Sequence, residues 1–98
     1  MSSLKFEWDE RKNILNQKKH NGISFKEAES VFADDFGLLI PDPDHSEGEE
    51  RFILMGVSAY SRLLVVCHCE RDHDTIRIIS ARKADKFERR QYEGGRHA

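Results

Sequence analysis

The sequence lacks the features that mark several large classes of protein. Its longest apolar runs, such as Leu63 to Cys67, are far shorter than the roughly 18 residues that a membrane-spanning helix needs. The N-terminal residues contain no apolar stretch of the kind that a secretory signal requires. No Gly-rich phosphate loop, HExxH motif or serine-hydrolase elbow is present. We therefore expect a cytoplasmic protein without a membrane span, and we expect neither nucleotide-fuelled nor zincin chemistry.

Cysteine is also scarce. Cys67 and Cys69 lie two residues apart in a predicted strand, whose extended backbone holds their Cβ atoms too far apart for an unstrained disulfide. Together with His68 and His73 they form the nearest candidate for a metal site. Alternation along a strand points His68 away from both sulfur atoms, and no further pair of ligands completes a tetrahedral set. We predict reduced thiols packed in a strand, no metal and no cofactor.

The length and the charge distribution favour one small domain. The chain has 98 residues, of which 38% are hydrophobic and 35% are charged. Its net charge of -2, taken alone, argues against a protein that binds a polyanion. However, residues 34–50 carry seven acidic side chains and no Lys or Arg, while residues 71–98 carry eight basic and five acidic side chains. One acidic segment thus offsets a mildly basic remainder. We expect residues 1–98 to form a single domain, with a disordered tail over 94–98.

The apolar patterns predict an α+β fold. Asp9 is placed to cap a first helix that ends before Asn21-Gly22, and the spacing of Ser24 and Glu27 is a capping box for a second helix. A last helix begins near Asp85 and runs through Tyr92. Short connections predict an antiparallel sheet of about four strands, with two N-terminal helices and one C-terminal helix. The predicted strands are Phe36–Ile40, Phe52–Val57, Leu63–Cys69 and Thr75–Ala81, with Phe6–Trp8 as a candidate edge strand.

Several cationic residues lie in or beside the predicted strands. Alternation predicts that Arg77 and Ala81 share one strand face, whereas Ile76, Ile78 and Ser80 share the other. An arginine in such a strand either pairs with a carboxylate or binds an anion, and planar guanidinium groups suit the oxygen atoms of a phosphodiester. Both alternatives remain open for the strand ends. The cationic residues at these ends are Arg51, Arg71, Arg82 and Lys83.

A second basic candidate lies on the first predicted helix. Lys12, Asn16 and either Lys19 or His20 recur at helical spacing, which places them on one polar face. This face is either a substrate contact or an ordinary solvated surface.

The acidic segment contains a candidate group for proton transfer. His45 lies near Glu47, Glu49 and Glu50, which precede Arg51. Neighbouring carboxylates raise the pKa of a histidine and neighbouring cations lower that of a carboxyl group, so this group could supply a proton acceptor and a donor near neutral pH. A solvated loop is the alternative.

The same residues belong to a set of short motifs that covers nearly all of residues 5–92. In their joint order and spacing the motifs resemble the BrnT family, the toxins of BrnT/BrnA type II toxin–antitoxin modules. One departure is Asn21, which looks like an extra residue between His20 and Gly22. The matching residues are Phe6-Glu7-Trp8-Asp9, Lys12, Asn16, Lys19-His20, Gly22-Ile23-Ser24-Phe25, Glu27-Ala28, Asp42-Pro43, His45-Ser46, Glu49-Glu50-Arg51, Gly56, Arg62, Ile76 to Ala84, Glu88-Arg89 and Tyr92.

The resemblance implies a RelE-like fold and an enzyme that cleaves RNA without a metal, inhibits translation and takes part in a stress response. It also implies neutralisation by a BrnA-type antitoxin with a ribbon-helix-helix part. Through that antitoxin the toxin would be held indirectly on operator DNA, and a toxin dimer within the complex is one expected arrangement.

Metal-free RNA cleavage requires a base for the 2′-hydroxyl proton, an acid for the leaving 5′-oxygen and cations for the phosphorane. We expect Glu50 to be the base, with His45 as the alternative. The expected catalytic residues are Glu50, Arg51, Arg71, Arg77, Arg82 and His45, and the expected substrate-binding residues are Lys12, Lys19, His20, Lys83 and Tyr92.

Two other interpretations fit the same residues. The chain could be a non-catalytic module that binds an antitoxin in operon co-repression, because arginine is common at protein interfaces. It could also be a toxin that the Asn21 insertion has weakened.

Overall fold

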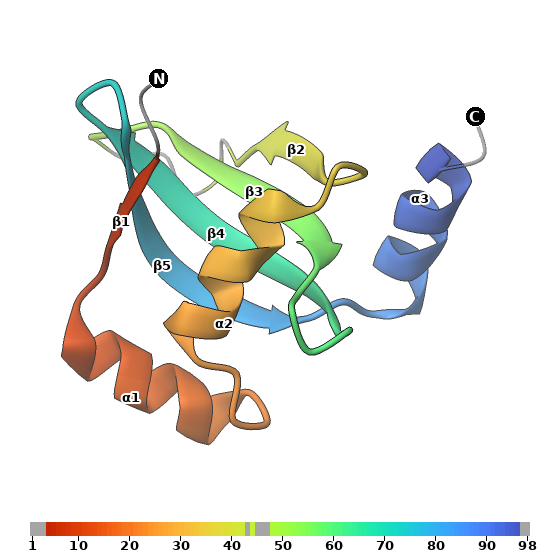
Figure 1. Ribbon diagram of the computed structural model, residues 1–98, viewed down its shortest axis with the longest axis horizontal. Coiled ribbons are helices and arrows are strands. Elements are labelled where there is room, and N and C mark those ends of the chain that lie inside the picture. Colours follow the sequence, from red (N-terminus) through yellow and green to blue (C-terminus); the bar gives the residue numbers. More distant parts are fainter. Residues whose placement is uncertain (1–3, 43, 45–47, 97–98) are drawn as a thin grey trace.

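The computed structural model describes residues 4–42, 44 and 48–96 as an α+β fold (Figure 1). The predicted fold class is therefore confirmed. None of the helices in these ranges is long and apolar enough to cross a membrane. The elements in chain order are β1 (Lys5–Glu7), α1 (Glu10–Lys19), α2 (Phe25–Ser30), the 3-10 helix η1 (Val31–Ala33), β2 (Leu38–Pro41), β3 (Arg51–Val57), β4 (Leu63–Arg71), β5 (Thr75–Lys83) and α3 (Lys86–Arg96).

The sheet has five strands in the order β1-β5-β4-β3-β2. Strands β2 to β5 pair antiparallel with their neighbours, but β1 pairs parallel with β5, with Glu7 opposite Arg77. The sheet therefore has five strands rather than about four, because the candidate edge strand Phe6–Trp8 is present as β1, one residue earlier in the chain. The prediction that the sheet is antiparallel was wrong for this strand. A three-residue strand gives a weak periodic signal, and its local sequence does not say which distant strand it meets.

The helices also differ from the predicted arrangement. The predicted second helix is divided into α2 and η1, with the change at Val31. The last helix runs on to Arg96, past the end predicted near Tyr92 and into the expected tail, because a helix tolerates a glycine such as Gly94 at a cost of about 1 kcal/mol. The predicted caps are present: Asp9 accepts from the backbone N–H of Arg11, and Ser24 accepts from that of Glu27.

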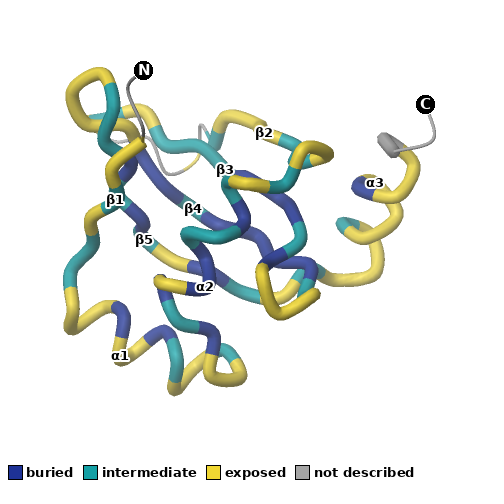
Figure 2. The backbone as a smooth tube through the Cα atoms, in the orientation of Figure 1, coloured by how far each residue is buried: buried dark blue, intermediate teal, exposed yellow. Residues whose placement is uncertain are grey.

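Apolar side chains pack on both faces of the sheet. Figure 2 shows that β4, in the middle of the sheet, is buried over most of its length. On one face, α2 and η1 bury Phe25, Ala28 and Val31 against β3, β4 and β5. On the other face, Tyr92 of α3 packs with Met55 and Val65, and its hydroxyl donates to Asp34 over 2.6 Å. Helix α3 thus covers one end of this second face.

A β-bulge in β5 changes which side chains face α2. His68 of β4 pairs with Ile78 and Cys67 pairs with Ser80, which leaves Ile79 as the extra residue. Ala81 therefore joins Ile78 in the core beneath α2, while Ser80 turns to the opposite face. The prediction that Ala81 shares a face with Arg77 was wrong, because strict alternation does not continue through a bulge.

Helix α1 turns its polar side chains toward the rest of the fold. Asn13 and Asn16 are buried, whereas Ile14 and Leu15 are 48% and 58% exposed. Asn13 accepts from the backbone N–H of Phe25 through its side-chain oxygen over 2.8 Å. The helix is therefore attached by hydrogen bonds rather than by an apolar stripe.

Asn16 completes the open edge of β5. Strand β1 pairs only with the first three residues of β5, so later residues on that edge need another partner. The Asn16 amide donates to the carbonyl of Ala81 over 2.8 Å, and its side-chain oxygen accepts from the Ala81 N–H over 3.1 Å. It also donates to the carbonyl of Ile23 over 2.9 Å. One amide thus replaces a strand partner and fixes α1 beside β5.

A buried ion pair connects α2 to the turn between β3 and β4. Glu27 is 4% exposed, and Arg62 binds both of its carboxylate oxygen atoms. Ser58 donates to the same carboxylate over 2.7 Å. Burial alone would raise the pKa of Glu27, but the hydrogen bonds from Arg62 and Ser58 outweigh burial and lower it.

We predict that Arg62→Ala lowers the free energy of unfolding by about 3 kcal/mol, because it leaves the Glu27 carboxylate buried without its cation. The matched control is Lys26→Ala, whose ion pair with Glu29 is exposed and should be worth less than about 1 kcal/mol. Urea unfolding at pH 7 measures both. Similar losses in the two variants would contradict this account of the pair.

The same pair predicts a pH dependence. The folded-state pKa of Glu27 lies below its ordinary value of 4.5, so the pair contributes its full stability above pH 4.5 and loses it as the pH falls through the folded-state pKa. The difference in the free energy of unfolding between wild type and Arg62→Ala should therefore become smaller as the pH falls below 4.5.

Candidate anion-binding site

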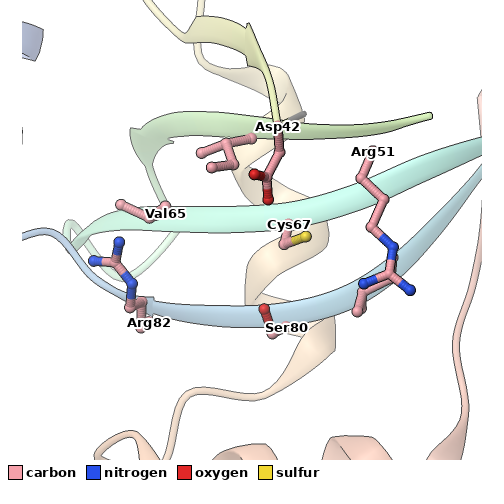
Figure 3. Close-up of a pocket in the computed structure, with 8 residues that line it drawn as sticks. Asp42, Arg51, Val65, Cys67, Ser80 and Arg82 are labelled. Atoms are coloured by element: carbon pink, nitrogen blue, oxygen red, sulfur yellow. The ribbon is translucent and has the colours of Figure 1, made fainter. Parts of the chain in front are cut away.

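A pocket opens on the sheet face opposite α2 (Figure 3). Its volume is about 230 Å³, and its floor is formed by β3, β4 and β5. Figure 3 shows Arg51 and Arg82 toward opposite ends of the pocket, with the Ser80 hydroxyl between them. The lining residues are Asp42, Arg51, Ile53, Val65, Cys67, Ile79, Ser80 and Arg82. Two guanidinium groups and a hydroxyl around one hollow suit an anion with several oxygen atoms.

Arg82 is oriented by the first turn of α3. Its two terminal nitrogen atoms bind the two carboxylate oxygen atoms of Glu88, each over 2.8 Å. Glu88 and Asp85 also accept from each other's backbone N–H, which forms a capping box at the start of α3. The hydrogen bonds with Arg82 lower the pKa of Glu88, and the reciprocal bonds raise that of Arg82. A guanidinium at the pocket wall is thus held by a carboxylate outside the pocket.

A second group of arginines lies near one end of the pocket. Arg51 of β3 is opposite Cys69 of β4, which in turn is opposite Arg77 of β5. Arg77 donates to Glu7 over 2.8 Å, and Arg71 lies 3.5 Å from Glu49. A hydrogen bond with Cys69, followed by the charge of Glu49, raises the pKa of Arg71. The sheet face therefore brings the predicted arginines together, and Arg71, Arg77 and Arg82 are held by carboxylates of the chain.

Acidic and neutral polar groups occupy the middle of the pocket. Figure 3 shows the Asp42 carboxylate pointing over β4 toward Cys67. Burial, followed by the negative charge of Asp42, raises the pKa of the Cys67 thiol, which keeps it protonated at neutral pH. Both cysteines are free thiols, as predicted. The backbone N–H of Asp42 donates to the carbonyl of Arg51 over 2.9 Å, so the two residues lie next to each other.

A groove between α1 and β5 continues from the pocket. Lys12, Lys19 and His20 line the groove, and Ile79 and Ser80 line both the groove and the pocket. Asn16, which fixes α1 to β5, lies in the groove as well. The basic candidates on α1 therefore lie next to the arginine pocket, although more than 50 residues of sequence separate them from β5.

Other predicted site residues lie outside the pocket lining. Glu50 is exposed and immediately precedes Arg51, and Lys83 is exposed at the end of β5. Tyr92 is 4% exposed and anchors α3. His45 lies outside the described residues.

Sequence reasoning gave no role to Asp42 or Ser80, both of which line the pocket. Asp42 was visible as part of a matching motif. Ser80 was assigned to the wrong strand face, and only the bulge at Ile79 brings it to the site.

His68 is not available to the pocket. As predicted, it points away from Cys67, and it packs against the rings of Phe32 and Phe52 with centroids 4.9 and 6.1 Å away. Burial lowers its pKa, so the ring is neutral at pH 7. Within the described ranges, no three His, Cys, Asp or Glu side chains gather in a group that could hold a metal ion.

Comparisons with known proteins give one family and one fold. Residues 8–88 match the family described as "Ribonuclease toxin, BrnT, of type II toxin-antitoxin system". The crystal structure of the Brucella abortus ribonuclease toxin BrnT is similar, with a TM-score of 0.66 and 21% sequence identity, over 86% of this chain and 100% of that one. A comparison with curated proteins found no match.

We predict that Glu88→Gln strengthens the binding of inorganic phosphate to the pocket, because the neutral amide releases Arg82 from its ion pair. A partly exposed pair of this kind is worth about 1 kcal/mol, which corresponds to an increase of about fivefold in affinity. Glu93→Gln, an exposed substitution on the same helix, is the control and should change nothing. Calorimetric titration measures both, and equal or weaker binding by Glu88→Gln would refute the competition.

Proposed function

The chain belongs to the BrnT family of ribonuclease toxins of type II toxin–antitoxin systems, and we propose that it cuts RNA in the cytoplasm and thereby inhibits translation. The observation that carries this proposal is the pocket with Arg51 and Arg82 toward its two ends and Ser80 between them. A phosphodiester is the anion that such a site suits best, because its two free oxygen atoms can accept from both guanidinium groups.

The proposed reaction is the metal-free cleavage of a phosphodiester by its neighbouring 2′-hydroxyl. A base removes the hydroxyl proton, the 2′-oxygen forms a bond to phosphorus, and the bond to the 5′-oxygen breaks as an acid protonates it. The pentacoordinate phosphorus carries extra negative charge. Arg51 and Arg82 would stabilise that charge from the pocket, with Arg71 and Arg77 contributing from the adjacent row.

The groove on α1 supplies contacts for the nucleotides beside the cleaved bond. Lys12 and Lys19 present ammonium groups along it, and it shares Ser80 with the pocket. An RNA strand that passes over Ser80 would place one phosphate in the pocket and a neighbouring one against α1. In this arrangement His20 or Lys12 acts as the acid, and Lys83 at the end of β5 extends the basic surface.

Two carboxylates are candidates for the base. Glu50 immediately precedes the pocket residue Arg51 and is exposed to solvent, so a bound strand could approach it. Asp42 lies within the pocket and points over β4. We favour Glu50, because it is exposed beside Arg51, whereas the Asp42 carboxylate points toward the Cys67 thiol on β4. His45 is the further alternative.

The partner in this proposal is an antitoxin of the BrnA type with a ribbon-helix-helix part. Membership of a type II toxin–antitoxin family implies an antitoxin. The RelE-like mode of action that we propose places RNA on the sheet face that α2 leaves open, so an antitoxin that covers this face or the groove would inhibit cleavage. Bound to operator DNA, the pair would repress its own synthesis.

A non-catalytic role is the second candidate function. Arg71, Arg77 and Arg82 each have a carboxylate partner within the chain, which is how arginines at a protein interface or in a structural network are held. In that case the chain would bind the antitoxin and act only in repression.

We predict that the purified chain cuts single-stranded RNA in the presence of EDTA, because no proposed step requires a metal. Arg51→Gln should reduce the rate by at least about 100-fold, which is typical for the loss of one preorganised cation at a developing charge. Arg11→Gln, on the outer side of α1, is the matched control and should cleave like wild type. Intact RNA after prolonged incubation with folded wild-type protein would favour the non-catalytic module.

The same assay assigns the base. Glu50→Gln should reduce the rate of RNA cleavage by about 100-fold or more, and the cleavage rate should no longer depend on pH through the ionisation of the base. Asp42→Asn should retain this pH dependence of the rate. The reverse result would transfer the role to Asp42.

A further inference from the structure

The outer side of α1 carries an apolar pair between two cations. Arg11, Ile14, Leu15 and Lys18 are spaced at i, i+3, i+4 and i+7, so they form one stripe along the helix, which we call the outer stripe. Ile14 and Leu15 are 48% and 58% exposed, and together with Arg11 they line a shallow hollow. Figure 2 shows most of this helix exposed, and its buried residues are Asn13 and Asn16.

This arrangement inverts an ordinary surface helix. Such a helix buries its apolar residues and exposes its polar ones, whereas α1 buries Asn13 and Asn16 and leaves Ile14 and Leu15 in solvent. The buried asparagines are needed to hold α1, as the hydrogen bonds of Asn16 to Ala81 demonstrate. Nothing within the described fold uses the apolar pair. A partner that covers it would recover the hydrophobic free energy that folding leaves unused.

From this geometry we infer that the outer stripe is the docking site for an acidic amphipathic helix of the antitoxin. The inference rests on the proposed function for the existence of that partner. An apolar pair at i and i+1 flanked by cations is complementary to a helix that has a small apolar face and carboxylates on either side. Helix α1 carries Lys12 and Lys19 as further exposed cations, and its one acidic residue is Glu10.

The charge also argues against a second copy of the chain as the occupant. A symmetric contact would place the outer stripe against itself, so that Arg11 and Lys18 would face the same cations of the other copy. An acidic helix avoids this repulsion and satisfies the cations.

The position of the stripe explains how docking would inhibit cleavage. Leu15 lines both the hollow of the outer stripe and the groove with Lys12 and Lys19. The groove in turn shares Ser80 with the arginine pocket. A helix seated on the stripe would extend its carboxylates to Lys12 and Lys19, and would therefore compete with RNA for the groove without entering the pocket.

The test uses the full-length chain and the antitoxin encoded beside it. The double variant Ile14→Ser with Lys18→Glu removes half of the apolar pair and reverses one flanking charge, while leaving every residue of the groove and the pocket in place. We expect calorimetry to show antitoxin affinity at least tenfold lower, with RNA cleavage by the free toxin and its melting temperature unchanged. Wild-type affinity should also fall as salt is added.

The matched control is Tyr60→Ser with Lys26→Glu, which alters an exposed aromatic residue and a cation that line a different hollow. It should bind the antitoxin like wild type. Equal affinity in the Ile14/Lys18 variant, loss only in the Tyr60/Lys26 variant, or no binding by wild type would each overturn the inference. Sedimentation of the free chain tests whether a second copy occupies the stripe instead. A dimer in the wild type that becomes a monomer in the Ile14/Lys18 variant would assign the stripe to a second copy. A failure of RNA cleavage with intact antitoxin binding would instead refute the proposed enzyme.

Discussion

The side-chain amide of Asn16 holds the functional half of this molecule together. Strand β1 is too short to cover β5, and Asn16 supplies the missing donor and acceptor to Ala81 at the uncovered edge. Its third hydrogen bond, to the Ile23 carbonyl, fixes the chain between α1 and α2. A buried amide that lost these partners would cost a few kcal/mol, so the position accepts few other side chains. Because of this contact, the basic residues of α1 lie beside the arginines of the sheet, and its apolar pair faces outward.

Carboxylates within the chain balance the arginines on the sheet face. Glu88 holds Arg82, Glu7 holds Arg77, and Glu49 lies near Arg71. These pairs keep long cationic side chains oriented at modest cost, because the partners are partly exposed and a phosphate can compete for the same nitrogen atoms. The pair of Glu27 and Arg62 differs, since its carboxylate is buried. It secures α2 and takes no part in the pocket. The net charge of the chain therefore says little about its capacity to bind an anion.

Local signals in the sequence predicted much of the fold. The caps at Asp9 and Ser24 and the strands β2 to β5 follow from neighbouring residues, and the structure contains them. The parallel pairing of β1, the bulge at Ile79 and the burial of Asn16 depend on contacts between distant segments, which periodicity does not report. The residues of the pocket divide in the same way, into those that local sequence identifies and those that depend on distant contacts. Arg51 and Arg82 were recognised from their strands, whereas Ser80 needed the bulge. Gly56 was part of the recognised motifs, and the structure explains why glycine stands there. A side chain at this position would collide with Val31.

The central claim is that Asn16 substitutes for a strand at the edge of β5, and hydrogen exchange of the Ala81 amide tests it most directly. In the wild-type chain this amide should be protected, because the Asn16 side chain accepts from it. In Asn16→Ala it should exchange about tenfold faster or more, as expected for the loss of one buried hydrogen bond. The Phe25 amide, which donates to Asn13, should remain protected in both proteins. An Ala81 amide that exchanges freely in the wild type, or that keeps its protection in Asn16→Ala, would contradict the account.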